Sequence, residues 1–252
     1  MRTGQRQREI LRQLYVTGYV EAKELATSLS VDASTIRRDL DALARAGRLQ
    51  RTHGGARALA GAVDVPYAIK QREHVSAKQA IAVAASALVG EGDRILLDSG
   101  STTYQLAVEL RDRRDLTIVT NDLLIGAVVA DYPGVRLLVT GGEMLSSTYT
   151  LFGDRAVSFV EALRVDWTFL GVDAIDPETG ITNTNTLEIP LKRMMLAAGR
   201  TRVALADSSK FGQRALVRVA DVSELDRIIT DDGLTAEQAA PYGARLVCVP
   251  SA

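Results

Sequence analysis

The chain has 252 residues, of which 46% are apolar and 24% charged, a composition typical of a folded globular protein rather than a disordered or collagen-like one. Its longest nearly apolar stretch, residues 80–89, is about half as long as the roughly 20 residues that a membrane-spanning helix needs. Residues 1–16 carry several charges and no apolar segment typical of a secretory signal. One cysteine excludes an internal disulfide, and two histidines leave too few soft ligands for a zinc site. We therefore expect a cytoplasmic protein without a membrane segment, a bound metal or a cofactor.

The net charge of −1 conceals two parts of opposite charge. Residues 1–57 contain eleven Lys and Arg against six Asp and Glu, a net charge of +5, whereas residues 58–252 carry a net charge of −6. This asymmetry is typical of a small polyanion-binding module attached to a domain with another task, although an uneven solvated surface would give the same numbers. The sequence pattern has to decide between the two.

Three short helices and a hairpin are predicted in the basic segment. Apolar residues at helical spacing over 10–15 indicate a first helix that ends at Gly18, and a second helix follows a short extended stretch and covers 21–28. Asp32 is the expected N-cap of a third helix that ends before Gly47. The few residues between the second and third helices match helix-turn-helix spacing, in which the later helix enters the DNA major groove.

The outward face of the third helix is suited to DNA. With Ile36 and Leu40 turned inward, this face carries hydroxyl and arginine side chains, which fit close groove approach and contacts to guanine edges or phosphates. Residues 48–57 then form a basic strand and a glycine turn suited to a wing. A solvated charged face is the alternative, and His53 is interpreted as a phosphate contact or as wing packing. The predicted DNA contacts are Ser34, Thr35, Arg37, Arg38, Arg51, His53 and Arg57.

In residue order as well as spacing, residues 8–56 resemble the winged helix-turn-helix of the DeoR family of bacterial sugar-metabolism regulators. The resemblance is strongest in Ser34-Thr35-Ile36-Arg37-Arg38-Asp39-Leu40 and in Arg51-Thr52-His53-Gly54-Gly55-Ala56. It implies binding to double-stranded operator DNA, usually as a repressor, by a homo-oligomer, either a dimer or a tetramer.

The rest of the chain predicts an α/β domain over 76–252, joined by a linker at 58–75 whose residues 65–69 are expected to pack on it. Ser76 and Gln79 form an expected capping box before an alanine-rich helix to Val89. Strands are expected at 94–97, 116–119, 135–139, 167–172, 203–206, 227–230 and 245–249, with helices near 103–110, 123–130, 154–163, 187–198 and 235–240. Such alternation predicts a mainly parallel sheet with helices on both faces and ligands at the carboxyl ends of the strands.

Polar residues follow these strands. After the first strand, Ser99 to Thr103 place hydroxyls and free N–H groups at a helix start, an arrangement that binds anions, although an ordinary capped turn has the same residues. No nucleotide P-loop or dinucleotide motif is present, so a small phosphate ester fits better. Lys210 could neutralise the phosphate, and the side chains of Asp98, Asn121, Asp173 and Glu188 could accept hydrogen bonds from sugar hydroxyls. Three of these residues have ordinary alternatives: Lys210 as a solvated lysine, Asn121 as a helix cap and Glu188 as a carboxylate in a first helical turn. The predicted effector-binding residues are Asp98, Ser99, Gly100, Ser101, Thr102, Thr103, Asn121, Asp173, Glu188 and Lys210.

The chain also resembles the effector domain of the DeoR family. The resemblance lies in residues 96–103, 119–121, 140–142, 169–173 and 206–212 and in Glu188 with Lys192. That domain is similar to the ribose-5-phosphate isomerase and glucosamine-6-phosphate deaminase fold, which implies a phosphorylated sugar as the effector. The chain departs from the family pattern at Ala174, at Phe152-Gly153-Asp154 and at Pro190, so the resemblance does not identify the sugar.

Two other functions fit less well. A sugar-phosphate isomerase or deaminase needs a group that moves a proton beside the substrate carbonyl; no histidine follows His74, although Asp98, Asp173 or Glu188 could act as the base. RNA binding would call for exposed aromatic residues near the basic segment, where few occur. We therefore expect a regulator and not an enzyme.

Overall fold

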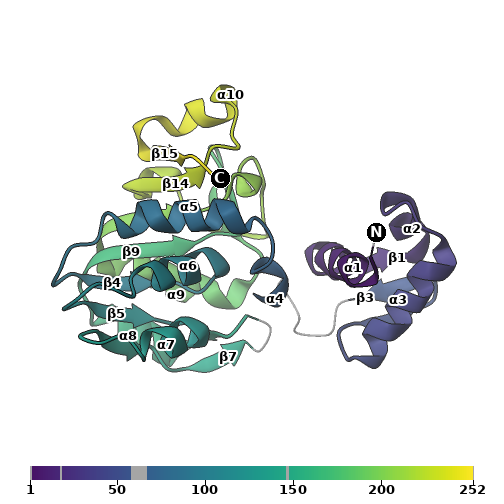
Figure 1. The fold of residues 1–252 in the computed structure, drawn as a ribbon, viewed down its shortest axis with the longest axis horizontal. Coiled ribbons are helices and arrows are strands. Elements are labelled where there is room, and N and C mark those ends of the chain that lie inside the picture. The colour runs from purple at the N-terminus through teal and green to yellow at the C-terminus, as the bar shows by residue number, and fades with distance from the viewer. Residues whose placement is uncertain (1, 18, 58–66, 146–147, 252) are drawn as a thin grey trace. The chain divides into compact units, whose positions relative to one another are not determined.

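The computed structural model describes residues 2–17, 19–57, 67–145 and 148–251, with the side chains of residues 15 and 16 left out. The chain divides into two compact units, Met1–Lys70 and Gln71–Ala252 (Figure 1). Each unit has its own hydrophobic core. Within the expected linker, residues 58–66 lie outside the described residues. The expectation that the end of this segment packs on the larger domain is wrong for Ile69, because α4 (Tyr67–Lys70) contributes its side chain to the core of the first unit.

Besides the short α4, the described part of the smaller unit has three helices and a three-stranded antiparallel sheet. Helices α1 (Thr3–Thr17), α2 (Ala22–Ser28) and α3 (Ala33–Arg45) are accompanied by β1 (Tyr19–Glu21), β2 (Gln50–Thr52) and β3 (Gly55–Arg57), in the order β1-β3-β2. The side chains of Ile10, Leu25 and Ile36, one from each helix, are almost fully buried. The winged helix-turn-helix predicted from the sequence is confirmed.

Gly55 makes the close pairing of the wing with β1 possible. It lies opposite Glu21 in the β1–β3 register, and a Cβ atom at this position would lie 2.1 Å from the carbonyl oxygen of Val20. Only a residue without a side chain fits there, so the glycine in this turn is needed for strand pairing.

The larger unit is built on a seven-stranded parallel sheet with the order β15-β14-β12-β9-β4-β5-β6. The register aligns the strand ends, because Leu97 pairs with Thr120 and Thr120 with Val139. The strands are β4 (Arg94–Leu97), β5 (Thr117–Thr120), β6 (Arg136–Val139), β9 (Val165–Gly171), β12 (Gly199–Leu205), β14 (Arg227–Asp231) and β15 (Leu246–Val249). The predicted α/β class and parallel sheet are confirmed.

Helices cover both faces of this sheet (Figure 1). Helices α5 (Val75–Ser86), α6 (Ser101–Glu109) and α7 (Leu123–Val129) pack on the face that carries Ile95, Leu97 and Phe169. Helices α8 (Asp154–Glu161) and α9 (Ile189–Ala198) pack on the opposite face, with Leu96 and Leu170. The side chains of successive strand residues therefore point to opposite faces of the sheet, and both faces are apolar because helices cover both. No helix within the described ranges is long and apolar enough to span a bilayer.

Two small sheets and one cap differ from the sequence prediction. Strands β7 (Glu143–Leu145) and β8 (Thr150–Phe152) form a hairpin, and β10 (Ala174–Asp176), β11 (Gly180–Asn183) and β13 (Val217–Ala220) form an antiparallel sheet in that order. Helix α10 (Ala236–Ala239) is followed by a 3₁₀ turn (Ala240–Arg245) and then by β15. The predicted capping box at Ser76 is wrong, because α5 begins at Val75 after His74, which adopts a left-handed conformation with φ 52°.

Candidate functional site

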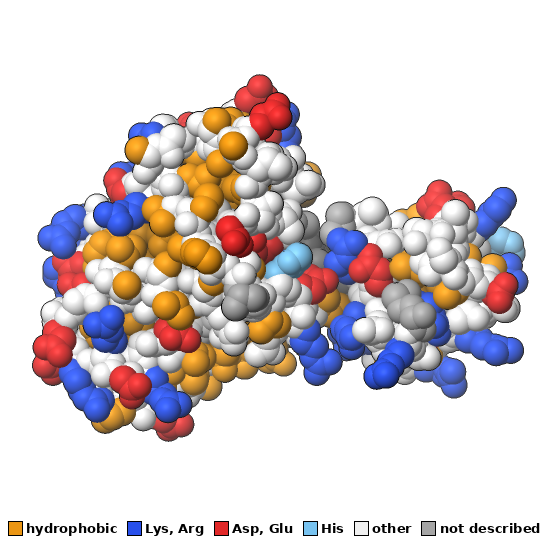
Figure 2. All heavy atoms as spheres, turned by 45° about the horizontal axis from the view of Figure 1, so that its top comes forward, with side chains coloured by type: hydrophobic (Ala, Val, Ile, Leu, Met, Phe, Trp, Pro, Cys, Tyr) orange, Lys and Arg blue, Asp and Glu red, His pale blue; other side chains and the backbone are white. Residues whose placement is uncertain are grey.

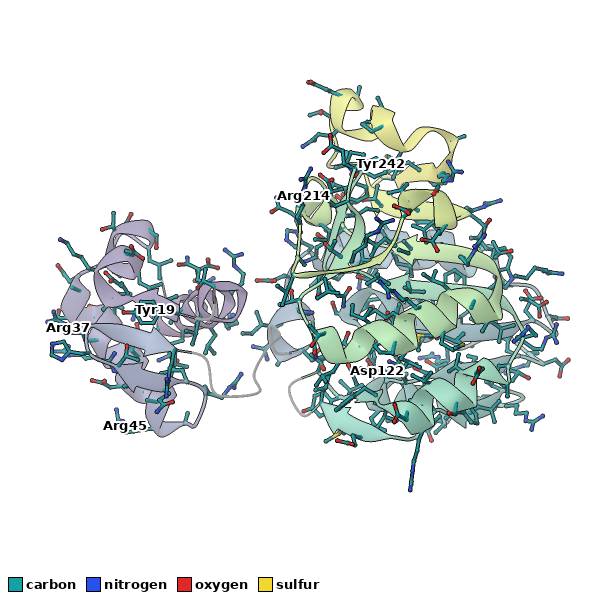
Figure 3. All side chains as sticks on the ribbon, turned by 180° about the vertical axis from the view of Figure 1, so that it is seen from behind. Tyr19, Arg37, Arg45, Asp122, Arg214 and Tyr242 are labelled. Atoms are coloured by element: carbon teal, nitrogen blue, oxygen red, sulfur yellow. The ribbon has the colours of Figure 1, made fainter. Side chains whose placement is uncertain are left out.

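The outward face of α3 is exposed and carries free cations. Ser34, Arg37 and Arg38 are exposed and Thr35 is half-buried, while Ile36 and Leu40 are fully buried beneath them. Neither Arg37 nor Arg38 forms an ion pair with any residue in the described part of the chain. Both guanidinium groups are therefore available to a polyanion. Figure 2 shows Lys and Arg side chains over the visible face of the smaller unit, and Figure 3 labels Arg37 and Arg45 on α3.

Asp39, on the predicted recognition helix α3, points into the interior of the smaller unit and not toward solvent. Asp39 is buried, with only 4% of its surface exposed, and it accepts hydrogen bonds from Arg6 Nε and, at 3.1 Å, from Gln7 Nε2 on α1. This buried ion pair joins α3 to α1. Sequence reasoning did not assign Asp39 a role, although its position between Ile36 and Leu40 places it on the inward side.

The wing residues differ in how they are engaged. Arg51 donates from Nε to Asp41 Oδ1 at 2.8 Å and from Nη1 to the carbonyl of Gly55, so it braces the wing against α3 in the free protein. Arg57 is exposed and donates from Nε to Gln50 Oε1 at 2.9 Å, and His53 is exposed at the turn. A phosphate contact by Arg51 stays a prediction and would require exchange of these bonds.

In the larger unit, the loop after β4 forms the start of α6. Gly100 is the N-cap with φ 147°, a conformation that side-chain-bearing residues rarely adopt. The first N–H groups of a helix have no partner inside it, so those of Ser101 to Thr103 face outward from the helix start. The hydroxyl of Ser99 accepts a 2.8 Å hydrogen bond from Thr150 Oγ1 of the hairpin. These groups form a polar cradle suited to an anion.

Asp122, which the sequence reasoning passed over, connects this loop to α7. Its Oδ2 accepts from the N–H of Gly100 at 3.3 Å, and its Oδ1 accepts from Leu124 and Ile125 at 2.7 and 3.1 Å (Figure 3). Burial raises the pKa of this carboxyl to about 6, against the lowering effect of these N–H bonds and with a further rise from Asp98. Asp122 thus orients Gly100 in the loop of residues 99–103.

A buried ionic cluster lies beside the loop. Lys192 Nζ donates to Asp98 Oδ2 and, at 2.9 Å, to the carbonyl of Gly171, and it lies 4.0 Å from Glu188 Oε2. Burial by itself would lower the pKa of Lys192, but the carboxylates of Asp98, Glu188 and Asp173 together raise it. The structure therefore joins two predicted residues, Asp98 and Glu188, through Lys192, which the resemblance paired with Glu188 but which was not among the predicted effector-binding residues. The spacing of Glu188 and Lys192 by one helical turn was the available signal.

Amide side chains complete the cluster. Asn183 and Asn185 donate from Nδ2 to the two carboxylate oxygens of Glu188 at 3.3 and 3.5 Å. Asp173 Oδ2 accepts from the N–H of Thr184 at 3.0 Å. Asn121 donates from Nδ2 to the carbonyl of Leu151 at 3.4 Å. The predicted positions Asp98, Asn121, Asp173 and Glu188 thus lie at the carboxyl ends of strands or in the connections that follow them.

Lys210 is not part of this cluster. It ends a short 3₁₀ turn (Ser208–Lys210) after β12, is half-buried, and forms no ion pair within the described ranges. In the sheet, β9 separates β12 from β4. A phosphate contact by Lys210 stays a prediction.

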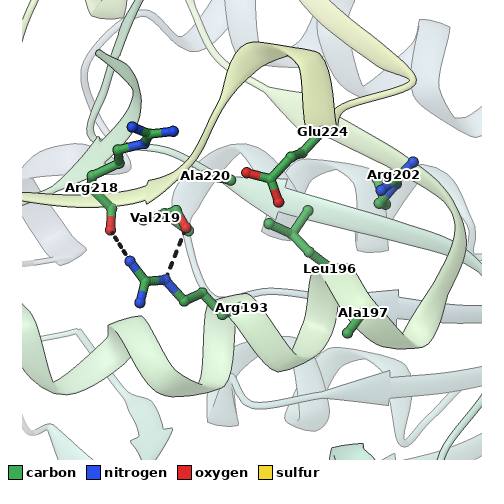
Figure 4. A pocket seen from close by; sticks show the side chains of 8 residues that line it. All are labelled: Arg193, Leu196, Ala197, Arg202, Arg218, Val219, Ala220 and Glu224. Atoms are coloured by element: carbon green, nitrogen blue, oxygen red, sulfur yellow. Dashed lines mark hydrogen bonds between the residues drawn. The ribbon is translucent and has the colours of Figure 1, made fainter.

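Two cavities lie elsewhere on the larger unit. One, of about 470 Å³, is lined by residues of α9, β12 and β13, including Arg193, Arg202 and Arg218 (Figure 4). Its arginines are engaged: Arg193 bonds the carbonyls of Val219 and Arg218, and Arg202 pairs with Asp226. The other, of about 540 Å³, borders the last 3₁₀ turn. Among the described residues, no group of three or more His, Cys, Asp or Glu could hold a metal.

Known protein families match both units of the chain. A family model described as "DeoR-like helix-turn-helix domain" matches residues 6–61, and one described as "DeoR C terminal sensor domain" matches residues 73–232. A putative aga operon transcriptional repressor of Escherichia coli O157:H7 is 33% identical over 93% of this chain and 88% of that protein. The glycerol-3-phosphate regulon repressor of Escherichia coli K12 is 30% identical over 92% of each.

Among solved structures, a ribose 5-phosphate isomerase A from Methanocaldococcus jannaschii matches 53% of this chain and 52% of its own length. Its identity is 19% and its TM-score 0.40, so the chemistry of that enzyme does not transfer to this chain. The two family models, and the relatives that match this chain over most of their length, agree with one another. The chain therefore belongs to the DeoR family of transcriptional regulators, in which a DNA-binding helix-turn-helix domain is followed by a sensor domain and neither is an enzyme.

Proposed function

We propose that this chain represses genes of sugar or polyol catabolism and is released from its operator by a phosphorylated sugar or polyol. The observation that carries the proposal is the pairing of an exposed arginine face on α3 with a buried polar cluster at the strand ends of a separate unit. The names of the relatives, an aga operon repressor and a glycerol-3-phosphate regulon repressor, support this class of regulated genes. A protein with this function acts in the cytoplasm, where the DNA is.

In this proposal α3 occupies the major groove. Ser34 and Thr35 lie at its start and approach the bases, while Arg37 and Arg38 contact guanine edges or phosphates. Arg57 and His53 of the wing contact the sugar-phosphate backbone, and Arg51 joins them once it leaves Asp41. Because each phosphate contact releases counterions, binding weakens as salt rises.

The effector places its phosphate on the anion loop. Ser99, Gly100, Ser101, Thr102 and Thr103 supply N–H and hydroxyl donors, and Lys210 approaches from the connection after β12, which lies two strands away from β4 in the sheet. The rest of the ligand reaches the oxygens of Asp98, Asn121, Asp173 and Glu188. Ligand binding draws these connections together, and the coupling to DNA affinity passes through the segment that joins the two units.

The functional unit is a homo-oligomer, either a dimer or a tetramer, because one helix-turn-helix covers only a half-site. The outward face of α5 suits the contact between copies. Val83 is 53% exposed and Ala87 exposed, with Ala80 and Ala84 half-buried between them, and residues 79–90 contain no charged side chain. Figure 2 shows hydrophobic side chains gathered on the visible face of the larger unit.

Light scattering tests the oligomer. The wild-type chain is expected to be dimeric or larger at micromolar concentration, and Val83→Asp is expected to shift it toward monomer by placing a charge in the contact. Ser158→Asp, exposed on α8 on the opposite side of the sheet, is the control. A monomeric wild-type chain would contradict the oligomer, and an unaffected Val83→Asp oligomer would move the interface away from α5.

A thermal-shift screen over phosphorylated sugars and polyols tests the effector. A ligand at 100 times its dissociation constant stabilises the native state by about 2.7 kcal/mol, which raises the melting temperature measurably. The matched unphosphorylated sugars are the controls and are expected to give no shift. A response to sugars irrespective of phosphate would contradict the role of the anion loop.

A further inference from the structure

We infer that the buried end of the effector site selects hydrogen-bond donors and excludes a carboxylate, so that the effector is the phosphate ester of a sugar, polyol or amino sugar and not of a sugar acid. This inference rests on the proposed effector function and adds to it the chemistry of the ligand end that lies away from the phosphate.

Three buried oxygen atoms at this end have no hydrogen-bond partner among the described residues. They are Asp98 Oδ1, Asn121 Oδ1 and Asn183 Oδ1, on residues that are 0%, 1% and 3% exposed. An unpaired buried polar atom costs roughly 1–3 kcal/mol, so such groups in a folded protein call for an explanation. All three atoms are acceptors. A ligand satisfies them only by donating, which hydroxyl and ammonium groups do and a carboxylate cannot.

The three residues belong to one neighbourhood. Leu97 pairs with Thr120 in the parallel sheet, so Asp98 and Asn121, the next residues, follow adjacent strands at the same level. Asn183 is tied to Glu188, which lies 4.0 Å from the same Lys192 ammonium that bonds Asp98. A single small molecule with several donors can therefore serve them together.

The charges of this cluster also disfavour a ligand carboxylate. Lys192 is its only cation within the described chain, and three carboxylates, those of Asp98, Glu188 and Asp173, act on it. With their usual charges these four groups sum to −2, so an additional carboxylate would meet repulsion in a site of low dielectric. The lysine is already engaged by the protein. Its ammonium donates to Asp98 Oδ2 and to the carbonyl of Gly171, and Glu188 Oε2 lies 4.0 Å away as a further counter-charge.

The phosphate has a separate place. The loop from Ser99 to Thr103 starts directly after Asp98, and it offers the helix start of α6 and the hydroxyl pair of Ser99 and Thr150. The loop suited to the phosphate thus begins directly after Asp98, which itself belongs to the acceptor-rich end of the site. The ligand that fits has one phosphate and, next to it, hydroxyl or amino groups.

Matched pairs of phosphate esters test the inference by isothermal titration of the full chain. Each pair has the same carbon number and differs in one end: glycerol 3-phosphate against 3-phosphoglycerate, erythritol 4-phosphate against 4-phosphoerythronate, and glucitol 6-phosphate against 6-phosphogluconate. For the chain length that binds most tightly, the acid is expected to bind at least about tenfold more weakly than the polyol. Glucosamine 6-phosphate is expected to bind at least as tightly as glucose 6-phosphate.

A variant ties the selectivity to this cluster. Asn183→Ala removes one unpaired acceptor, and it is expected to weaken the preferred polyol or sugar phosphate about fivefold or more while leaving inorganic phosphate binding unchanged. Gln79→Ala, exposed on α5, is the control and is expected to match wild type. Melting temperatures of both variants show whether they fold.

The outcomes separate the inference from the function on which it rests. A sugar-acid phosphate that binds as tightly as its polyol partner overturns the inference and leaves the proposed effector function standing. Equal effects of Asn183→Ala on the polyol phosphate and on inorganic phosphate would also overturn it. If none of the esters binds, the effector function is wrong, and the inference falls with it.

Discussion

At the scale of single residues, the buried ionic groups could not be identified from the sequence. Asp39 and Asp41 are two residues apart on α3, yet Asp39 pairs with Arg6 in the interior and Asp41 with Arg51 at the surface. Lys192 and Lys210 differ in the same way, because one is buried among carboxylates and the other is not. A sequence shows which residues are charged, but partners distant in the chain decide which charges are enclosed.

Asp39→Ala is expected to destabilise the smaller unit by about 3–5 kcal/mol, because it leaves the buried guanidinium of Arg6 without its carboxylate. The measurement is amide hydrogen exchange across α1 and α3 in the full chain. Asp41→Ala on the same helix is the control, since an exposed ion pair contributes roughly 0–1 kcal/mol. Equal losses of protection in the two variants would show that the Arg6–Asp39 pair does not hold α3 in place.

Asp122 gives the larger unit a specific pH dependence. Its folded-state pKa of about 6 lies above the ordinary value of 3.8, so the folded chain binds this proton more tightly than the unfolded chain does. The contribution of Asp122 to the free energy of unfolding is therefore largest below about pH 4, and it falls by about 3 kcal/mol as the pH rises through 6.

Urea unfolding of wild type and Asp122→Asn at pH 4 and pH 7 measures this effect. The asparagine cannot titrate, so the stability of wild type relative to the variant is expected to decrease between the two pH values. A difference that is the same at both would mean that the hydrogen bonds from Gly100, Leu124 and Ile125 keep the carboxylate charged at both.

At the scale of elements, the strands of the parallel sheet could be predicted from the sequence, and the two small antiparallel sheets could not. All seven strands of the parallel sheet were predicted, because buried parallel strands are short apolar runs between helical segments. The β7–β8 hairpin and the β10-β11-β13 sheet were not predicted. In the second of these, β11 pairs with β13 across a long stretch of chain, Thr182 opposite Arg218, which no local pattern indicates. The positions of the anion loop and of Asp98 followed from the strand ends.

Gly55→Ala is expected to disrupt the wing, because the added Cβ would lie 2.1 Å from the carbonyl oxygen of Val20 and separate β3 from β1. Affinity for duplex DNA should fall together with protection of the β1 and β3 amides. Gly4→Ala is the control: its Cβ would meet only Arg8, at 3.8 Å, and alanine favours the helix there. Unchanged DNA affinity in Gly55→Ala would remove the wing from the proposed interface.

At the scale of the whole molecule, the two units make different use of charge. The first 57 residues carry a net charge of +5 and expose unpaired arginines, whereas the rest of the chain is acidic and encloses its cation at the strand ends. The first arrangement suits a long polyanion and the second a small ligand. If one ligand changes the affinity for the other, thermodynamic linkage requires the same factor in both directions, typically 1–3 kcal/mol of coupling.

The most direct test is fluorescence anisotropy of a labelled duplex, selected from random sequence by the full chain, with and without the phosphate ester that gives the largest thermal shift. The ester is expected to weaken DNA binding by about fivefold or more, and Arg38→Ala is expected to weaken it by about 1–3 kcal/mol without the ester. Lys210→Ala should keep DNA binding and lose the response to the ester. DNA affinity that is the same with and without a bound ester would contradict the account.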